Sequence, residues 1–458
     1  MTPRASRHLI ALFLAGLLAA CADAAGGAVT LRVFAAAGPD PLDSAVTLRL
    51  GLVGGASVIL PRDSAFDLDA IGLQGAAGTH QVYLEALDAA GQVVARGVSR
   101  PEVLGGDSAT FIDLVLRRIG AFSAGLGPVE VGDAYPRIAS GASLGDGALL
   151  SGREGLFLVD TWLVSTAAVL GDSARAELGG LLASGPLLLH DDDDMDRIVL
   201  ANAAGCAALK RDRGVYATDI APVCTGTKTI RSDASVLALR GSGWWVVGGQ
   251  AAPGGGGDCA FVTYAPCGDG CSAEVVVSPC ADLATPRSRP IVVAAGGRVA
   301  IVGGTTAGAW GELRPLHNPA AGIETLVDGP ARPPTDGATY GADSAVFVGD
   351  GTPNIYALVD GVLGVAGTLG RTRAGAAVAV LPDGRLIVAG GRAEDSATSA
   401  ELLRQNSSGQ FEFISEVLLL VPRSDAHFAA APQGPVLVGG VAFGTTEPVS
   451  VIEAYLPP

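Results

Sequence analysis

Residues Thr372–Gly391 read T-R-A-G-A-A-V-A-V-L-P-D-G-R-L-I-V-A-G-G. An apolar run in this stretch leads to a Pro382-Asp383-Gly384 turn, and a second apolar run ends in the pair Gly390-Gly391. Two short apolar segments joined by an Asp-Gly turn predict a β-hairpin. We therefore expect short antiparallel strands, and not helices, to build this part of the chain.

The same pattern recurs along the chain. An apolar segment that ends in glycine, or once in asparagine, is found at Gly152, Asn202, Gly248, Gly303, Gly349, Gly390 and Gly439. The intervals of 50, 46, 55, 46, 41 and 49 residues indicate a repeat architecture. The unit resembles the kelch repeat of β-propellers, in which each repeat forms one blade. The resemblance implies a kelch-like propeller over residues 121–458 with about seven blades, six being possible. A glycine-rich β-solenoid or a pair of sandwiches is the alternative.

A second all-β domain is expected over residues 28–118. Alternating apolar and polar residues predict short strands, at Val29–Phe34, Val46–Leu50, His80–Leu87, Gln92–Ala95 and Thr110–Leu116. The stretch Val82–Gly97 resembles the closing hairpin of bacterial immunoglobulin-like (Ig-like) domains. An N-terminal Ig-like β-sandwich followed by the propeller is thus the predicted fold.

The composition limits the classes of partner. Apolar residues make up 49% of the 458 residues, and 65 glycines with 27 prolines favour many turns. The net charge of −16 argues against nucleic acid, because phosphate binding needs clusters of Lys and Arg.

The N-terminus has the pattern of a lipoprotein signal. Arg4 and Arg7 precede an apolar run over residues 9–20, which is typical of a secretory signal. The run ends Leu18-Ala19-Ala20-Cys21, which resembles the lipobox of bacterial lipoproteins. The resemblance implies a signal peptide over 1–20, acylation of Cys21, a tether over 21–27 and a place on the outer membrane in the cell envelope. Cleavage after Ala20 or Ala25 without acylation is the alternative.

Six further cysteines predict disulfide bonds, as expected outside the cytoplasm. Cys206 and Cys224 are alone in the second repeat, so we expect them to pair. Opposed residues of an antiparallel hairpin have a constant sum of residue numbers. The sums are 538 for Cys267 with Cys271 and 539 for Cys259 with Cys280, so one bulge aligns both pairs. A zinc site of four thiolates is the less favoured alternative, since its usual two-residue spacing is missing.

The densest group of charges lies on a predicted turn, at Asp191, Asp192, Asp193, Asp194 and Asp196. Calcium takes several oxygen ligands, so this turn is a weak candidate metal site. A solvated acidic turn is favoured, because no glycine turn or distal glutamate follows. No cofactor other than this calcium ion is expected.

The last repeat is one strand short of a four-stranded blade. It contains strand patterns at 426–431, 435–440 and 449–456 before Pro457-Pro458. We expect residues 122–131 to supply the fourth strand by pairing beside residues 449–455.

No motif identifies a reaction. Gly141-Ala142-Ser143-Leu144-Gly145 matches G-x-S-x-G, but another apolar run follows it instead of a helix. The sequence favours a membrane-anchored, non-enzymatic propeller that binds an unknown protein or glycan. The alternatives are an enzyme, glycan-active or other, with its site in the central mouth of the propeller, and a structural spacer of the envelope.

Overall fold

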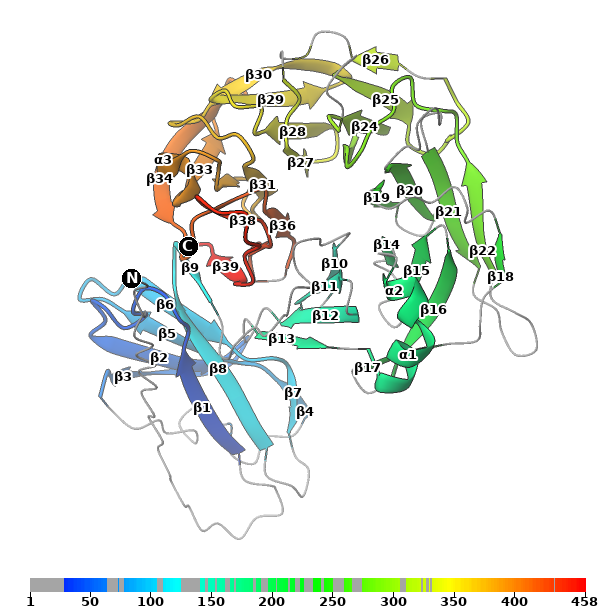
Figure 1. Ribbon diagram of the computed structural model, residues 1–458. Helices are drawn as coiled ribbons and strands as arrows, with labels where there is room; N and C mark the ends of the chain where they lie inside the picture. The colour runs from blue at the N-terminus through cyan, green and yellow to red at the C-terminus, as the bar shows by residue number, and fades with distance from the viewer. Residues whose placement is uncertain are drawn as a thin grey trace, which may run out of the picture. The chain divides into compact units, whose positions relative to one another are not determined.

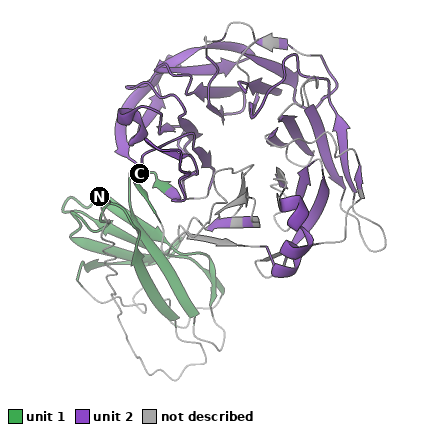
Figure 2. Ribbon diagram, in the orientation of Figure 1, with its two compact units in different colours: residues 1–127, 162–165, 454–458 green, residues 128–161, 166–453 purple. Residues whose placement is uncertain are grey.

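The computed structural model divides the chain into two compact units, which we describe separately (Figures 1 and 2). Unit 1 comprises residues 1–127, 162–165 and 454–458, and unit 2 comprises residues 128–161 and 166–453. The residues that the structure describes are 29–63, 73, 78–104, 110–124, 141–144, 147–152, 155–160, 165–168, 170–183, 187–190, 197–202, 204–212, 215–218, 223–225, 234–239, 243–249, 259–265, 274–304, 310–322, 324–326, 329, 332–431 and 433–458.

Unit 1 is built on a six-stranded sheet. Its order is β1 (Val29–Ala35), β8 (Thr110–Arg118), β6 (Val93–Val98), β5 (Val82–Leu87), β2 (Thr47–Leu52) and β3 (Ser57–Pro61). β1 runs parallel to β8, and the other pairs are antiparallel. The described strands of this unit also include a two-stranded sheet of β4 (Gly78–His80) with β7 (Glu102–Leu104).

Apolar side chains on one face of the six-stranded sheet form the core of unit 1. Leu50, Leu84 and Ile112 are buried there together with Leu73 and Leu104 of β7. Charged side chains such as Arg49 and Glu85 pair across neighbouring strands. The predicted strands and the all-β character are confirmed, and the Ig-like resemblance stays a prediction.

Unit 2 contains a succession of hairpin-connected blades, of which the fifth and sixth are joined in one eight-stranded sheet (Figure 1). The first three are β10 (Gly141–Leu144), β11 (Gly147–Gly152), β12 (Gly155–Asp160) and β13 (Ser165–Ala168); β14 (Leu187–His190), β15 (Arg197–Asn202), β16 (Gly205–Asp212) and β17 (Val215–Thr218); and β19 (Ala234–Leu239), β20 (Gly243–Gly248), β21 (Cys259–Ala265) and β22 (Glu274–Pro279). A fifth strand, β18 (Val223–Thr225), lies parallel to β22.

The later blades repeat the pattern. They are β23 (Ile291–Ala295), β24 (Arg298–Val302), β25 (Gly311–Pro315) and β26 (Glu324–Leu326); β27 (Asp336–Tyr340), β28 (Ser344–Val348), β29 (Asn354–Val359) and β30 (Val362–Thr368); and β31 (Ala377–Val380), β32 (Leu386–Ala389), β33 (Ser399–Gln405) and β34 (Phe411–Leu418). The short helices α1 (Asp172–Glu177) and α2 (Gly179–Ala183) precede blade 2, and α3 (Glu394–Ala397) lies in blade 6.

The last blade combines the final described strand with a short strand that precedes the first blade in the sequence. Its order is β36 (His427–Ala429), β37 (Val436–Val438), β39 (Glu453–Leu456) and β9 (Ala121–Ser123). The short strands β35 (Arg423–Ser424) and β38 (Val441–Ala442) pair beside it. β39 pairs antiparallel with β9, and Tyr455 lies opposite Phe122. The predicted pairing of residues 122–131 beside residues 449–455 is thus confirmed at Phe122 and Ser123, and residues 125–131 lie outside the described residues.

The first strands of the seven blades form a closed ring. β10, β14, β19, β23, β27, β31 and β36 contact one another in this order, and β36 contacts β10. Each second strand ends at or just before the glycine or asparagine that the sequence repeat predicts. The all-β fold with a seven-bladed propeller is therefore confirmed.

Backbone contacts explain the repeated glycines. A Cβ atom at Gly390 would lie 2.6 Å from the carbonyl oxygen of Arg423 in the next blade, and the φ angle there is +73°. At Gly248 the equivalent distance to the carbonyl oxygen of Arg287 is also 2.6 Å. Only glycine fits such a close approach in the left-handed region. The glycine therefore permits adjacent blades to pack directly.

Candidate functional site

Three inner strands begin with residues at corresponding positions of blades 5, 6 and 7. Asp336 pairs with Val348, Ala377 with Ala389 and His427 with Val438, and each partner directly precedes the glycine of its repeat. β27, β31 and β36 are neighbours in the ring. We call Asp336, Ala377, Val378, Asp425 and His427 the axial cluster.

Asp336 connects blade 5 to blade 6. Its Oδ2 atom accepts a hydrogen bond of 2.9 Å from the backbone N–H of Val378, and its Oδ1 atom accepts one of 2.9 Å from Gly337. These two donors fix the orientation of the carboxyl group. Burial raises the pKa of Asp336 above its ordinary value of 3.8, although His427 and the backbone donors act in the opposite direction.

His427 lies one blade beyond Ala377 and is exposed. Blade 6, with Ala377 at the corresponding position, lies between the blades of Asp336 and His427, and His427 acts to lower the pKa of the Asp336 carboxyl. An accessible imidazole at this end of the inner strands can exchange protons with a bound ligand.

An exposed ion pair lies two residues from His427. Arg392 Nη2 donates to Asp425 Oδ1 at 2.8 Å, and Arg392 Nε donates to Oδ2 at 3.2 Å. The backbone N–H of Asp425 donates to the carbonyl of Gly375, two residues before Ala377. The pair therefore lies at the same end of the inner strands as the axial cluster. Asp425 raises the pKa of Arg392, so the guanidinium stays charged.

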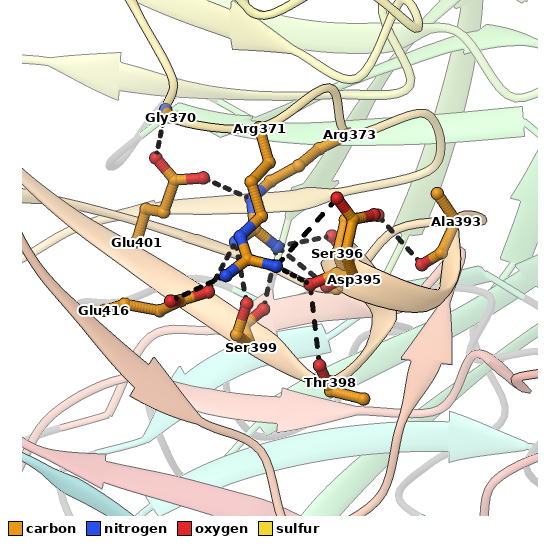
Figure 3. A network of polar contacts seen from close by, with 11 residues as sticks. Gly370, Arg371, Arg373, Ala393, Asp395, Ser396, Thr398, Ser399, Glu401 and Glu416 are labelled. Carbon is orange, nitrogen blue, oxygen red and sulfur yellow. Dashed lines mark hydrogen bonds and ion pairs between the residues drawn. The ribbon is translucent and has the colours of Figure 1, made fainter.

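A different set of charges is buried between the strands of single blades, and Figure 3 shows the one in blade 6, formed by Arg373 and Glu401. In blade 6, Arg373 Nε donates to Glu401 at 2.9 Å, and Arg373 Nη1 donates to the carbonyl of Gly390 at 3.0 Å. Arg423 with Glu453 in blade 7 and Arg287 with Glu312 in blade 4 form the same kind of pair. All six side chains are buried, and burial lowers the pKa of each of the three arginines. These pairs hold the blades together and are closed to a ligand.

Blade 5 departs from this pattern. Its residue at the position of Glu401 is Tyr356, since both pair with the residue two places before the repeat glycine. The Tyr356 hydroxyl donates to Asp350 Oδ2 at 3.0 Å, inside the blade. The carboxylate of a buried arginine pair is therefore replaced by a phenol that is already bound.

The cysteines form two of the expected bonds. Cys259 is bonded to Cys280, and the register of β21 with β22 has the residue-number sum of 539 that the sequence predicts. Cys206 is bonded to Cys224. Cys224, however, lies on β18, which pairs with β22 of blade 3. The second bond thus joins blades 2 and 3, whereas the sequence placed it within one repeat. Cys267 and Cys271 lie outside the described residues.

The other predicted site residues lie outside the described part of the chain. These are Cys21 and the acidic turn of Asp191, Asp192, Asp193, Asp194 and Asp196. Ser143 lies on β10, the first strand of a hairpin with β11, so it is not on a nucleophile elbow. Among the described residues, no group of three or more His, Cys, Asp or Glu side chains could hold a metal ion.

No local motif in the sequence predicts the axial cluster. The only signal was positional, since Asp336, Ala377 and His427 lie 13, 13 and 12 residues before their repeat glycines. That signal becomes visible only when the repeats are aligned on the glycines and the blades are closed into a ring.

Comparison with known proteins describes the fold. No protein-family model matches the chain, and the search of curated proteins finds no match. Among solved structures, a fungal alcohol oxidase of the AA5 family, in complex with copper, is similar over 71% of this chain and 75% of its own. The identity is 15% and the TM-score is 0.46, so the likeness assigns no substrate or metal to this chain.

The comparison corrects one expectation. The sequence favoured a non-enzymatic protein, but the solved structure with a similar fold is an oxidase. That prediction is therefore not retained.

No helix in the described ranges is both long and apolar enough to cross a membrane.

Proposed function

We propose that this protein is an exported enzyme that acts on a polar ligand, with its site at the axial cluster. The observation that carries the proposal is the hydrogen-bonded Asp336 carboxyl at the strand position that corresponds to the exposed His427 two blades further on. A titratable group whose pKa is shifted by burial and by a specific charged neighbour is a mark of functional sites. A glycan is the ligand class that we favour, because it offers hydroxyl groups for hydrogen bonding and proton transfer.

The two side chains have different roles in this proposal. The backbone donors of Gly337 and Val378 hold Asp336 in place, so it orients the ligand and the imidazole. His427 is accessible and exchanges a proton with a ligand hydroxyl. Ligand binding without turnover, as on a scaffold, needs the same residues and is one outcome of the test.

The test compares Asp336→Asn and His427→Gln with the natural chain on a panel of oligosaccharides. His427→Gln should lower turnover by about 10²–10⁴-fold, the usual contribution of one acid–base group, and Asp336→Asn should lower turnover through the loss of ligand positioning. Asp343→Asn, at an exposed position beyond the other end of β27, is the matched control and should be neutral.

The pH dependence of the free energy of unfolding gives a second test of Asp336→Asn. Because the folded state raises the pKa of Asp336 above 3.8, it binds this proton more tightly than the unfolded chain does. Stability should therefore fall as pH rises through the folded-state pKa, and Asp336→Asn should remove this fall. Unaltered turnover and ligand binding in both axial variants would overturn the proposed site.

We also propose that the chain is anchored to the envelope through acylated Cys21. The bonds Cys206–Cys224 and Cys259–Cys280 support an oxidising compartment. Mass spectrometry of the mature N-terminus should find a diacyl or triacyl cysteine. An unmodified terminus, or one that begins after Ala25, would count against the anchor.

A further inference from the structure

The departure of blade 5 from the repeat leaves one arginine without its usual partner. Arg287, Arg373 and Arg423 each precede the first residue position of their inner strand by four places, and each is buried against a glutamate. The residue four places before Asp336 is Arg332. The glutamate position of this blade holds Tyr356, which is bound to Asp350. Arg332 is exposed, and no ion pair or hydrogen bond joins its side chain to another described residue.

Distances measured at Gly351 and Gly375 locate the guanidinium groups of Arg332 and Arg392. A Cβ atom at Gly351 would lie 3.5 Å from Arg332 Nη1 and 3.7 Å from the Cβ atom of Ala374. A Cβ atom at Gly375 would lie 3.2 Å from Arg392 Nε. Ala374 and Gly375 are adjacent, so the guanidinium groups of Arg332 and Arg392 flank the same short segment.

The ion pair with Asp425 uses only two of the three nitrogen atoms of the Arg392 guanidinium. Its Nε and Nη2 atoms bind Asp425, and the side chain is still 62% exposed. Among the described residues, Nη1 has no acceptor. One arginine held by a carboxylate and one without a partner among the described residues thus both lie near residues 374–375, at the end of blades 5 and 6 that carries the axial cluster. Guanidinium groups bind oxyanions through paired N–H donors.

We infer that Arg332 and Arg392 form an oxyanion subsite that selects an acidic glycan for the axial cluster. The group recognised is a carboxylate or a sulfate, which share the same donor geometry. The subsite contrasts with the net charge of −16, because a local pair of cations is needed to attract an anion to an acidic protein. The inference names the ligand class of the function proposed above.

The experiment measures binding, so that it fails separately from the proposed chemistry. Oligogalacturonate carries carboxylates, dextran sulfate carries sulfates, and dextran is the neutral control. Titration calorimetry should show that the natural chain binds at least one acidic probe more tightly than dextran. Arg332→Gln and Arg392→Gln should each weaken that binding by about tenfold, the loss expected for one charge-assisted contact.

The matched control is Arg404→Gln. Arg404 is exposed near the far end of β33. Its substitution therefore removes the same positive charge at a place away from the subsite. Equal weakening by this variant, unaltered binding in the two subsite variants, or no binding of either acidic probe would overturn the inference. Weakened binding in the subsite variants, with turnover unaffected by Asp336→Asn, would support the subsite and reject the proposed acid–base site.

Discussion

At the scale of single residues, three buried arginines explain much of the sequence repeat. In blades 4, 6 and 7 the guanidinium donates to the carbonyl of the repeat glycine, and a glutamate from the third strand balances its charge. Removing one member of such a pair leaves an uncompensated charge in the interior. The arginine, the glycine and the glutamate therefore form one structural unit, although they lie far apart in each repeat.

Glu401→Gln tests this at the residue scale. The substitution keeps the shape of the side chain but removes the buried counter-charge of Arg373, which is left with only the partly exposed Glu416 at 4.0 Å. We expect a loss of about 3–5 kcal/mol in the free energy of unfolding, measured with denaturant. Glu324→Gln removes the partner of an exposed pair with Arg298 and should cost no more than about 1 kcal/mol. Similar losses in the two variants would contradict a special role for burial.

At the scale of strands, the last blade depends on the final segment of the chain. Glu453 on β39 accepts the backbone N–H groups of Leu420 and Val421 and binds Arg423. The carbonyl of Val451 accepts a further hydrogen bond from Arg423 at 2.9 Å. One short segment thus supplies a strand, a counter-ion and the acceptor for a neighbouring loop.

Truncation after Pro448 should therefore prevent folding. It removes β39, leaves Arg423 buried without Glu453, and exposes the edges of β37 and β9. We expect insoluble protein, measured as the soluble fraction after expression and by size-exclusion chromatography. Removal of Pro457 and Pro458 alone is the control and should leave a soluble, folded chain. A soluble truncated protein with the natural circular dichroism spectrum would show that β39 is dispensable.

The strands also show what a sequence can predict. The Gly-Gly ends and the register of Cys259 with Cys280 follow from local periods, and the structure confirms them. β18 has only three residues, so no period marks it, and the blade that receives Cys224 could not be predicted. Asp336 and His427 reach corresponding positions only through the packing of β27, β31 and β36 in succession, a long-range property that neither local pattern contains.

At the scale of the whole molecule, the two disulfides constrain the propeller differently. Cys259–Cys280 lies within the hairpin of β21 and β22, whereas Cys206–Cys224 links β16 of blade 2 to β18 on the edge of blade 3. The sequence separations of 21 and 18 residues are similar. Loop entropy therefore predicts about 3 kcal/mol for each bond. Only the second bond joins two blades.

Paired alanine variants separate these effects. Cys206→Ala with Cys224→Ala should increase hydrogen exchange in β18 and along the outer edge of β22, because β18 is held there by only three residue pairs and the disulfide. Cys259→Ala with Cys280→Ala should lower stability by a similar amount without releasing β18. Hydrogen-exchange mass spectrometry checks both, and unchanged protection of β18 in the first variant would refute the linkage.

The carbonyl groups of Arg287 and Arg423 have a consequence for protein engineering. Each accepts a hydrogen bond from the second glycine of the preceding blade, at 2.9 Å and 3.0 Å, while its side chain serves its own blade. The natural module for grafting thus begins at the arginine and not at the first strand. A designer who exchanges blades should cut the chain just before this residue. The inserted segment then carries the arginine carbonyl that accepts the hydrogen bond from the preceding blade of the host protein. Blade 5 would be a poor choice for such an exchange, because Tyr356 stands where the other blades have the glutamate that balances the arginine.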